Sequence, residues 1–378
     1  MRYIGILLHC YQPPWQEKEV LSKISAECYT PLFEWIYHHP EPTLTLNINY
    51  SLLDLLKTNG HAYLLESLSR LISLNRVELT GTAAFHPILP LVPKTEVERQ
   101  ILLNEAGIQK ILGINFKKMG FFPPELAINQ QLATIVKNFG YSWLVADDET
   151  FVCRHGFAPF NFIPTINDLP IILRSRLWSQ RLAFRQIPYT NHGNEFINYL
   201  QYELDRWFGG NDGYLLIALD GETFGHHHKN YIDFLIQLWK NIYNKPGWKL
   251  CPVSKIVEHF PKKELQIPSG TWSTSCDDFN RGVIFSLWDH PNNIAQKLLW
   301  RIIHILLPYM NNGDDATRDL MDRALNSCQF WWLSPEHWNP QNAFKTIPIY
   351  LKIIQKVNLS DSDASIVNSI LNEIKQTS

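Results

Sequence analysis

The stretch that decides the fold is Tyr214–Lys229, which reads YLLIALDGETFGHHHK. Its first six residues are apolar, as in a strand that is buried on both faces. Asp220 and Glu222 follow where this strand ends. In parallel α/β folds the substrate-binding loops gather at the carboxyl ends of the strands, so this position favours chemistry. A second interpretation stays open, in which Asp220 only caps a helix at 229–245.

Asp220 and Glu222 are two like charges close to an apolar wall. Such an environment raises the pKa of at least one carboxyl group, so we expect one of them to hold a proton at neutral pH. The three histidines at 226–228 could suggest a metal, but consecutive residues cannot all point at one ion. We therefore expect neither a metal nor a cofactor, and a loop in which His226 faces the site.

The composition limits the classes of partner. The chain has 378 residues, with 34 Lys and Arg against 36 Asp and Glu. This near balance provides no wide basic surface for nucleic acid and favours a neutral partner or substrate. No apolar run approaches the roughly 18 residues of a membrane span. The short apolar run at the N-terminus is typical of a first strand rather than a signal. We expect a cytoplasmic protein with no membrane or nucleic-acid partner, and we make no prediction of its oligomeric state.

The cysteines give no pattern of a metal cluster or a disulfide scaffold. The six of them lie far apart, without a C-x-x-C pair. Reduced and mostly buried thiols are the expectation.

Short apolar runs alternate with helical patterns along the first 260 residues. We expect strands at 3–8, 43–49, 77–80, 119–122, 141–146, 160–166, 170–174 and 214–219. We expect helices at 17–38, 51–74, 94–112, from 129, at 192–208, 229–245 and 252–259. About seven alternations, with polar residues at the strand ends, indicate a parallel barrel. A doubly wound open sheet alternates similarly, but no G-x-G-x-x-G follows the first strand.

After about residue 245 the pattern changes. A polar loop near 269–278 carries Trp272, Asp277 and Asp278, and helical patterns follow at 291–309, 315–332, 341–356 and 363–376. We therefore expect a catalytic barrel over 1–260 and a helical region over 261–378. This helical region should pack on the barrel and contribute the Trp/Asp loop to the site.

Polar residues also mark the other expected strands. His9 ends the first strand, just before Tyr11 and Gln12. Glu78 lies inside a strand, where a carboxylate is costly unless it is paired or hydrogen-bonded. It therefore belongs to the site or is locked to an arginine, and we favour the site. His86 is the one polar side chain in the proline-rich run FHPILPL, and Glu125 follows the strand that ends at Phe122.

Taken together and in order, these motifs resemble glycoside hydrolase family 57, whose members are retaining enzymes that act mostly on α-glucans. The resemblance covers residues 3 to about 290. It rests on His9 with Gln12-Pro13, on VELT at 77–80, on HPILPL at 86–91, on GFFPPE at 120–125 and on DGETFGH at 220–226. A weaker block falls on Trp272–Asp278.

The resemblance implies an irregular (β/α)7 barrel followed by helices, with Glu125 as nucleophile and Asp220 as general acid/base. The residues expected to bind the sugar are His9, Tyr11, Gln12, Glu78, His86, Glu222, His226, Trp272, Asp277 and Asp278. Tyr11 stands where the family's opening motif has a second histidine, which puts a sugar contact, and with it specificity or activity, in question. The expected substrate is an oligo- or polysaccharide; hydrolysis and transfer stay open.

Other interpretations stay open. His9, His86, Asp147 and His226 could form the metal cluster of a polysaccharide deacetylase. Tyr11 allows a non-catalytic, glucan-binding protein. Trp272 or Trp178 could stack on a sugar ring, although core packing is the commoner role of each aromatic. The tryptophans at 331, 332 and 338 are interpreted as packing of the helical region, with a sugar subsite as the alternative.

Overall fold

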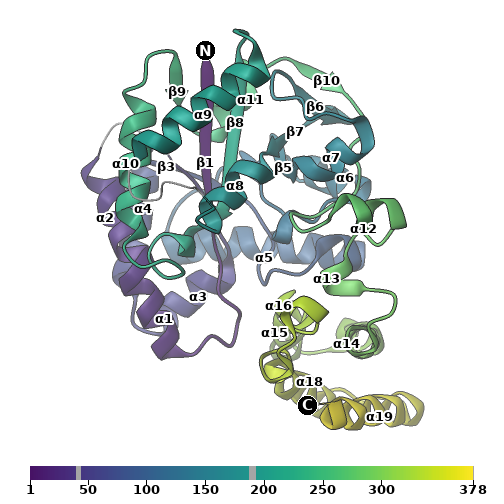
Figure 1. Ribbon diagram of the computed structural model, residues 1–378. Helices are drawn as coiled ribbons and strands as arrows, with labels where there is room; N and C mark the ends of the chain where they lie inside the picture. Colours follow the sequence, from purple (N-terminus) through teal and green to yellow (C-terminus); the bar gives the residue numbers. More distant parts are fainter. Residues whose placement is uncertain (40–43, 187–192, 378) are drawn as a thin grey trace.

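The computed structural model describes residues 1–39, 44–186 and 193–377 and has an α/β architecture (Figure 1). Every residue of the first strand is buried, and the eighth strand is buried up to Asp220, as their apolar runs predict. The strands are β1 (Arg2–Cys10), β2 (Leu44–Ile48), β3 (Val77–Thr80), β4 (Gly120–Phe121), β5 (Trp143–Asp147), β6 (Ile163–Ile166), β7 (Leu169–Arg174), β8 (Gly213–Asp220), β9 (Trp248–Leu250) and β10 (Lys262–Glu264).

Seven of the strands form a ring. β3, β2, β1 and β8 make one parallel sheet, and β4, β5 and β7 make a second one. Two narrow contacts join the sheets: a bridge between Gly81 and Phe121, and a hydrogen bond of 2.8 Å from the backbone N–H of Ser175 to the carbonyl of Leu216. The ring is therefore the irregular (β/α)7 barrel that the sequence predicts. β6 is antiparallel to β7 and lies outside the ring.

Glycine permits the junction between β3 and β4. A Cβ atom at Gly81 would lie 2.1 Å from the hydroxyl of Tyr141, and one at Gly120 would lie 2.1 Å from the ring of Trp143. Only a residue without a side chain allows the two strands and these rings to come so close.

Helices cover the barrel and fill the C-terminal region. Around the barrel they are α1 (Lys18–Ile24), α2 (Thr30–His38), α3 (Tyr50–Thr58), α4 (Ala62–Ser73), α5 (Lys94–Leu112), α6 (Gln130–Asn138), α7 (Asp148–His155), α8 (Arg176–Ala183), α9 (Gly193–Phe208), α10 (Tyr231–Tyr243) and α11 (Val253–His259). The C-terminal helices are α12 (Cys276–Arg281), α13 (Ser286–Asp289), α14 (Ile294–Leu306), α15 (Asp315–Ala324), α16 (Cys328–Trp331), α17 (Pro340–Ala343), α18 (Ile347–Lys356) and α19 (Asp361–Thr377).

Several expected helices differ from the observed ones. The pattern at 51–74 divides into α3 and α4, because the chain turns at Gly60, whose φ is +87°. The pattern at 315–332 divides into α15 and α16, and the one at 17–38 contains a π-helical segment, η1 (Ser25–Tyr29). The short helices α7 and α8 were not expected. Positions 43 and 192, at the start of two expected elements, lie outside the described residues.

The C-terminal helices gather at one end of the molecule. Figure 1 shows them, in yellow and light green, at the end toward which β1 runs from the N-terminus. α5 and α15 are joined by an ion pair of 2.7 Å between Arg99 and Asp322. The boundary expected near residue 260 falls between α11 and β10, and β10 still pairs with β6. The carboxyl ends of the barrel strands thus face the C-terminal region.

The structure corrects the expectation that all thiols are reduced. Cys153 of α7 and Cys276 of α12 form a disulfide, with 5.5 Å between their Cα atoms. They lie 123 positions apart in the sequence, and no local pattern marks the pair. The other four cysteines are free, and three of them are buried. In the part of the chain that the structure describes, no helix is both long and apolar enough to cross a membrane.

Candidate active site

A cavity of about 600 Å³ opens at the carboxyl ends of the barrel strands, against the C-terminal helices. It gathers side chains from strand ends, from the loop before α12 and from α16. Nine of the twelve expected site residues line it: His9, Tyr11, Gln12, His86, Glu125, Asp220, Glu222, Trp272 and Asp278.

Glu78 lies elsewhere, which corrects the expectation that it faces the site. Its carboxylate accepts hydrogen bonds from Thr45 Oγ1 at 2.9 Å and from the backbone N–H of Ser254 at 3.2 Å, at the start of α11. The strand pleat puts Glu78 on the same side as Thr80, but two residues nearer the amino end of the strand. It therefore caps the start of α11, at the end of the barrel opposite the cavity. Among the described residues no arginine pairs with it.

Two further expected residues also lie outside the cavity lining. His226 Nδ1 is 2.7 Å from Oε2 of Glu27, so this side chain turns toward η1. Its neighbour His227 lines the cavity instead. Asp277 is exposed and pairs with Arg281 at 3.1 Å, whereas Asp278 reaches the cavity and completes the N-terminal capping box of α12.

Glu125 is held in an uncommon backbone conformation. It lies in the short helix η3 (Pro124–Leu126) with φ at +58°, a region that side chains other than glycine rarely adopt. Trp272 fixes it twice: the indole Nε1 donates to Oε2 at 2.7 Å, and the backbone N–H donates to the Glu125 carbonyl at 3.0 Å. Strained residues of this kind cluster at functional sites, where surrounding contacts hold them in place.

Two neutral histidines connect β1 to the wall beside Glu125. Burial lowers the pKa of His9 and lowers that of His86 well below its usual value. The amide of Asn47 donates to Thr80, so its oxygen accepts from His9 Nδ1 at 2.6 Å. His9 Nε2 therefore accepts from His86 Nε2 at 3.1 Å.

The same assignment fixes the other nitrogen of His86. Its Nδ1 accepts from the hydroxyl of Ser327 at 2.9 Å and lies 3.8 Å from Glu125 Oε1. Like Glu125, His86 has a positive φ, +62°. Ser327 directly precedes α16, so the C-terminal region contributes to this wall.

Asp220 ends β8 in register with His9 of β1. Burial raises its pKa, and His9 when it is protonated, together with Arg174, acts in the opposite direction. Burial also raises the pKa of Glu125 to about 8, with a further contribution from the charge of Asp220. Because each carboxylate disfavours ionisation of the other, the two hold one proton between them near neutral pH. Within the described residues no group hydrogen-bonds to the carboxylate of Asp220.

Glu222 is bound by the protein itself. Its Oε1 accepts from the backbone N–H of Tyr11 at 3.3 Å, from Gln12 Nε2 at 3.2 Å and from the hydroxyl of Tyr29. Burial and the charge of Asp220 raise its pKa to about 7. Glu222 thus fixes the chain that follows β1 and places Tyr11, whose ring stacks on His86 with centroids 4.0 Å apart.

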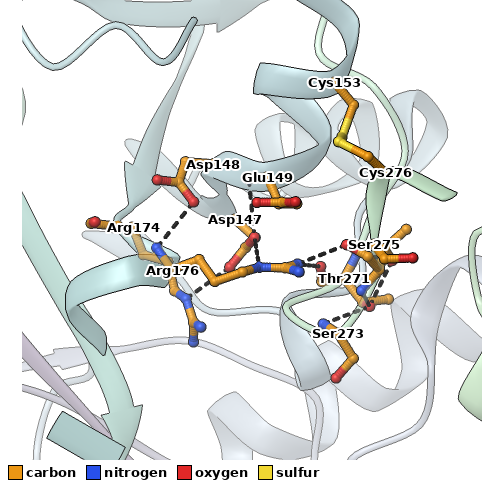
Figure 2. Close-up of polar contacts among 12 residues, drawn as sticks. Asp147, Asp148, Glu149, Cys153, Arg174, Arg176, Thr271, Ser273, Ser275 and Cys276 are labelled. Atoms are coloured by element: carbon orange, nitrogen blue, oxygen red, sulfur yellow. Dashed lines mark hydrogen bonds and ion pairs between the residues drawn. A yellow bond between two sulfur atoms is a disulfide. The ribbon is translucent and has the colours of Figure 1, made fainter. Parts of the chain in front are cut away.

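The cavity wall also contains a buried charge network that sequence reasoning missed. Arg174, at the end of β7, and Arg176, in α8, each lie 2.8 Å from a carboxylate oxygen of Asp147 (Figure 2). Arg176 also donates to the carbonyls of Thr271 and Thr274, which fixes the loop that carries Trp272. Arg174 ends the strand expected at 170–174, and Arg176 follows two residues later. Their position at a strand end was the signal in the sequence that could have identified them.

Aromatic residues of the C-terminal region form the outer wall. Trp331, Trp332 and His337 line the cavity, and the rings of Trp331 and His337 stack with centroids 3.9 Å apart. Trp338 is half exposed and lies outside the lining. Trp178 is fully buried against Phe196, so it is a core residue and does not stack on a ligand.

The donor set of the deacetylase interpretation does not assemble. Asp147 is bound by two arginines, and His226 by Glu27. Among the residues that the structure describes, one group has the spacing of metal ligands: Glu149, Cys153 and Cys276. The two thiols of this group are joined in the disulfide.

Comparisons with known proteins identify relatives of the chain. The chain is 25% identical over 265 residues to alpha-amylase 1 of Dictyoglomus thermophilum; the match covers 68% of this chain and 35% of that protein. The chain thus spans about a third of the length of this curated relative.

Solved structures share the fold. The 4-alpha-glucanotransferase of Thermococcus litoralis matches 95% of this chain, over 59% of its own length, with a TM-score of 0.74 and 17% identity. A branching enzyme of Thermococcus kodakaraensis matches 99% of this chain and 94% of its own, with a TM-score of 0.73 and 13% identity. The model of glycosyl hydrolase family 57 matches residues 7–268. This chain therefore belongs to glycosyl hydrolase family 57.

Proposed function

We propose that the protein is a retaining glycoside hydrolase or transglycosylase that acts on α-glucan, with Glu125 as nucleophile and Asp220 as general acid/base. The observation that carries the proposal is the pair itself. Two carboxyl groups from separate strand ends line one cavity; burial raises the pKa of both, and the charge of Asp220 raises that of Glu125 further. Retaining glycosidases use such a pair about 5–5.5 Å apart.

The surroundings of the pair fit these roles. The indole of Trp272 donates to Glu125, which favours the anion there and fixes its direction of attack. Asp220 has no hydrogen-bond partner among the described residues, so its proton is free for the glycosidic oxygen. Glu125 would attack the anomeric carbon while Asp220 protonates the leaving oxygen, which gives a covalent glycosyl-enzyme.

In the second step Asp220 acts as a base. It takes a proton from water in hydrolysis, or from a sugar hydroxyl in transfer, while the acceptor oxygen attacks the anomeric carbon and Glu125 leaves. The ring nitrogens of His9 and His86 are engaged with Asn47, with each other and with Ser327, so a sugar hydroxyl can hydrogen-bond to them only by displacing one of these partners. The rings of Trp331 and Trp332 offer apolar faces to further sugars of the chain.

Tyr11 is the departure from the family's motif that bears on specificity. Its ring stacks on His86 and its hydroxyl lies 3.4 Å from Sγ of Cys328, so the side chain fills space between β1 and α16. We expect it to narrow the sugar site near His86 without removing either carboxylate.

Incubation with maltooligosaccharides of defined length tests the proposal. Shorter products alone indicate hydrolysis, and shorter and longer products together indicate transfer. Glu125→Gln should abolish both. Glu78→Gln is the matched control, because it replaces a half-buried strand glutamate outside the cavity and should keep turnover. If the wild-type protein binds the oligosaccharides but forms no product, the enzymatic assignment is wrong and a non-catalytic glucan-binding protein remains.

A further inference from the structure

Arg174 is a buried cation of the cavity wall that the mechanism above does not use. It is 4% exposed, and its Nη1 donates to the backbone carbonyl of Ala218 at 3.0 Å. Its guanidinium carbon lies 5.3 Å from the centre of the Trp272 ring. Arg174 therefore contacts both the strand that ends in Asp220 and the indole that donates to Glu125.

The need to neutralise the charge of Asp147 does not by itself explain why Arg174 is buried here. Asp147 has Arg176 at 2.8 Å on its other oxygen, as Figure 2 shows. The neighbouring Asp148 has its pKa raised to about 7, first by burial and then by the charge of Asp147. Asp148 therefore ionises less readily than a free aspartate, so the two arginines face less than two full negative charges near neutral pH. The network keeps an excess of positive charge at the wall of a cavity that holds two carboxyl groups.

We propose that Arg174 is a positioning residue of this site, which holds the Trp272 indole against Glu125 and fixes the strand end that carries Asp220. The inference rests on the proposed function. A guanidinium suits both tasks, because its flat face stacks on an indole while its edge donates hydrogen bonds. Its charge also stabilises negative charge inside the cavity.

The charge gives the role a distinct signature in the pH dependence. The titratable groups that face Asp220 are His9 and Cys10 of β1, Glu222 of its own loop, Glu125 after β4 and Arg174 of β7. Of these, Arg174 and His9 lower the pKa of Asp220. Removal of the arginine's charge should therefore move the alkaline limb of the kcat/KM profile to higher pH.

The experiment compares Arg174→Met, Arg174→Lys and the control Arg99→Met. The control removes an arginine that pairs with the buried Asp322 outside the cavity. Arg174→Met should lower kcat on maltooligosaccharides by about 30-fold or more, with a small change in KM and a shifted alkaline limb. Arg174→Lys should keep the limb and lower kcat about tenfold, because an ammonium cannot stack and reach Ala218 together. Arg99→Met should lose thermal stability but keep kcat and the limb.

Several results would overturn the proposal. If Arg174→Met keeps the wild-type kcat, or if the alkaline limb of its kcat/KM profile stays at the wild-type pH, the arginine has a purely structural role. If Arg174→Met does not fold, wild-type kcat in Arg174→Lys has the same meaning. A crystal structure of the lysine variant gives a readout independent of activity: the Trp272 indole should leave Glu125, and an intact hydrogen bond there contradicts the inference. An inactive wild-type protein refutes the proposed function instead, and the crystallographic test still decides the inference.

Discussion

Glu125 and Asp220 line the same cavity but reach it from different kinds of local structure. Glu125 lies in a strained turn and is hydrogen-bonded through both its side chain and its backbone to Trp272. Asp220 ends a regular eight-residue strand, and no group hydrogen-bonds to its carboxylate within the described ranges. A nucleophile must approach one carbon along one direction, whereas an acid/base must exchange its proton with changing partners. This difference in hydrogen bonding agrees with the proposed roles of Glu125 as nucleophile and Asp220 as general acid/base.

Replacement of either carboxyl group by an amide should have the largest effect on activity. Glu125→Gln and Asp220→Asn should each lower turnover of maltooligosaccharides by about 10³-fold or more. An aryl α-glucoside with a good leaving group, supplied with azide, separates the two roles. Azide should restore turnover in Asp220→Asn and give the α-glucosyl azide, because neither the leaving group nor azide needs the missing acid/base. The same product from Glu125→Gln instead would reverse the assignment.

The disulfide should stabilise the part of the site that contains Glu125, because Cys276 directly follows the loop that carries Trp272. The double variant Cys153→Ala/Cys276→Ala should lower the free energy of unfolding by about 2–5 kcal/mol, because the cross-link constrains a long segment of the unfolded chain. Urea unfolding measures this loss. Dithiothreitol should destabilise the wild-type protein similarly and leave the double variant unchanged. Equal stabilities of the wild-type protein and the double variant would show that the cross-link is not formed in solution.

Trp272→Phe removes the indole donor to Glu125 but keeps an aromatic ring. We expect kcat to fall by about 10- to 100-fold with little change in KM, because the donor orients a group that acts in the transition state. Steady-state kinetics on a single maltooligosaccharide measures the split. Trp178→Phe is the matched control: it loses an equivalent N–H in the core, and its kcat should stay near the wild-type value. A fall of equal size in both variants would mean that Trp272 acts through stability alone.

The pH dependence should sharpen the comparison. The pair needs its one proton on Asp220, whose pKa is raised by burial. The pair becomes fully ionised only above about 8, the pKa to which burial and the charge of Asp220 raise Glu125. The kcat/KM of the wild-type enzyme should therefore fall about tenfold per pH unit above that value. In Asp220→Asn, acting on an activated glucoside, the alkaline limb should disappear because no acid is needed. A limb that persists in this variant would belong to another group.

The sequence predicted the barrel, and nine of the twelve expected site residues line the cavity, because strand ends carry local signals. A buried apolar run that ends in a polar residue marks a carboxyl end, as at His9 and Asp220. A different argument, the cost of burying a carboxylate inside a strand, misplaced Glu78. Alternation along a strand tells which face a side chain takes, but it does not tell how far along the barrel axis that side chain lies. The resemblance named Glu125, but not the conformation that holds it.

Local sequence patterns could not predict contacts between segments that lie far apart in the chain. The disulfide joins two cysteines 123 positions apart. Ser327 reaches His86, and the pair Trp331-Trp332 reaches the cavity, because α16 packs near the strand ends. A sugar subsite at these tryptophans is only the alternative interpretation of the sequence. The choice between His226 and His227 depends on how one turn closes after Glu222. The roles assigned to all these side chains stay predictions until the variants are measured.

The chain order of the site has a consequence for how the protein is made. A ribosome completes all seven strands of the ring by Asp220, yet the indole that fixes Glu125 comes about fifty residues later, and Ser327 about a hundred. Domains generally fold from the N-terminal side during synthesis. The emerging barrel thus carries both carboxyl groups before the contacts that orient Glu125 exist, and the nascent protein has no organised nucleophile until the loop that carries Trp272 has been translated.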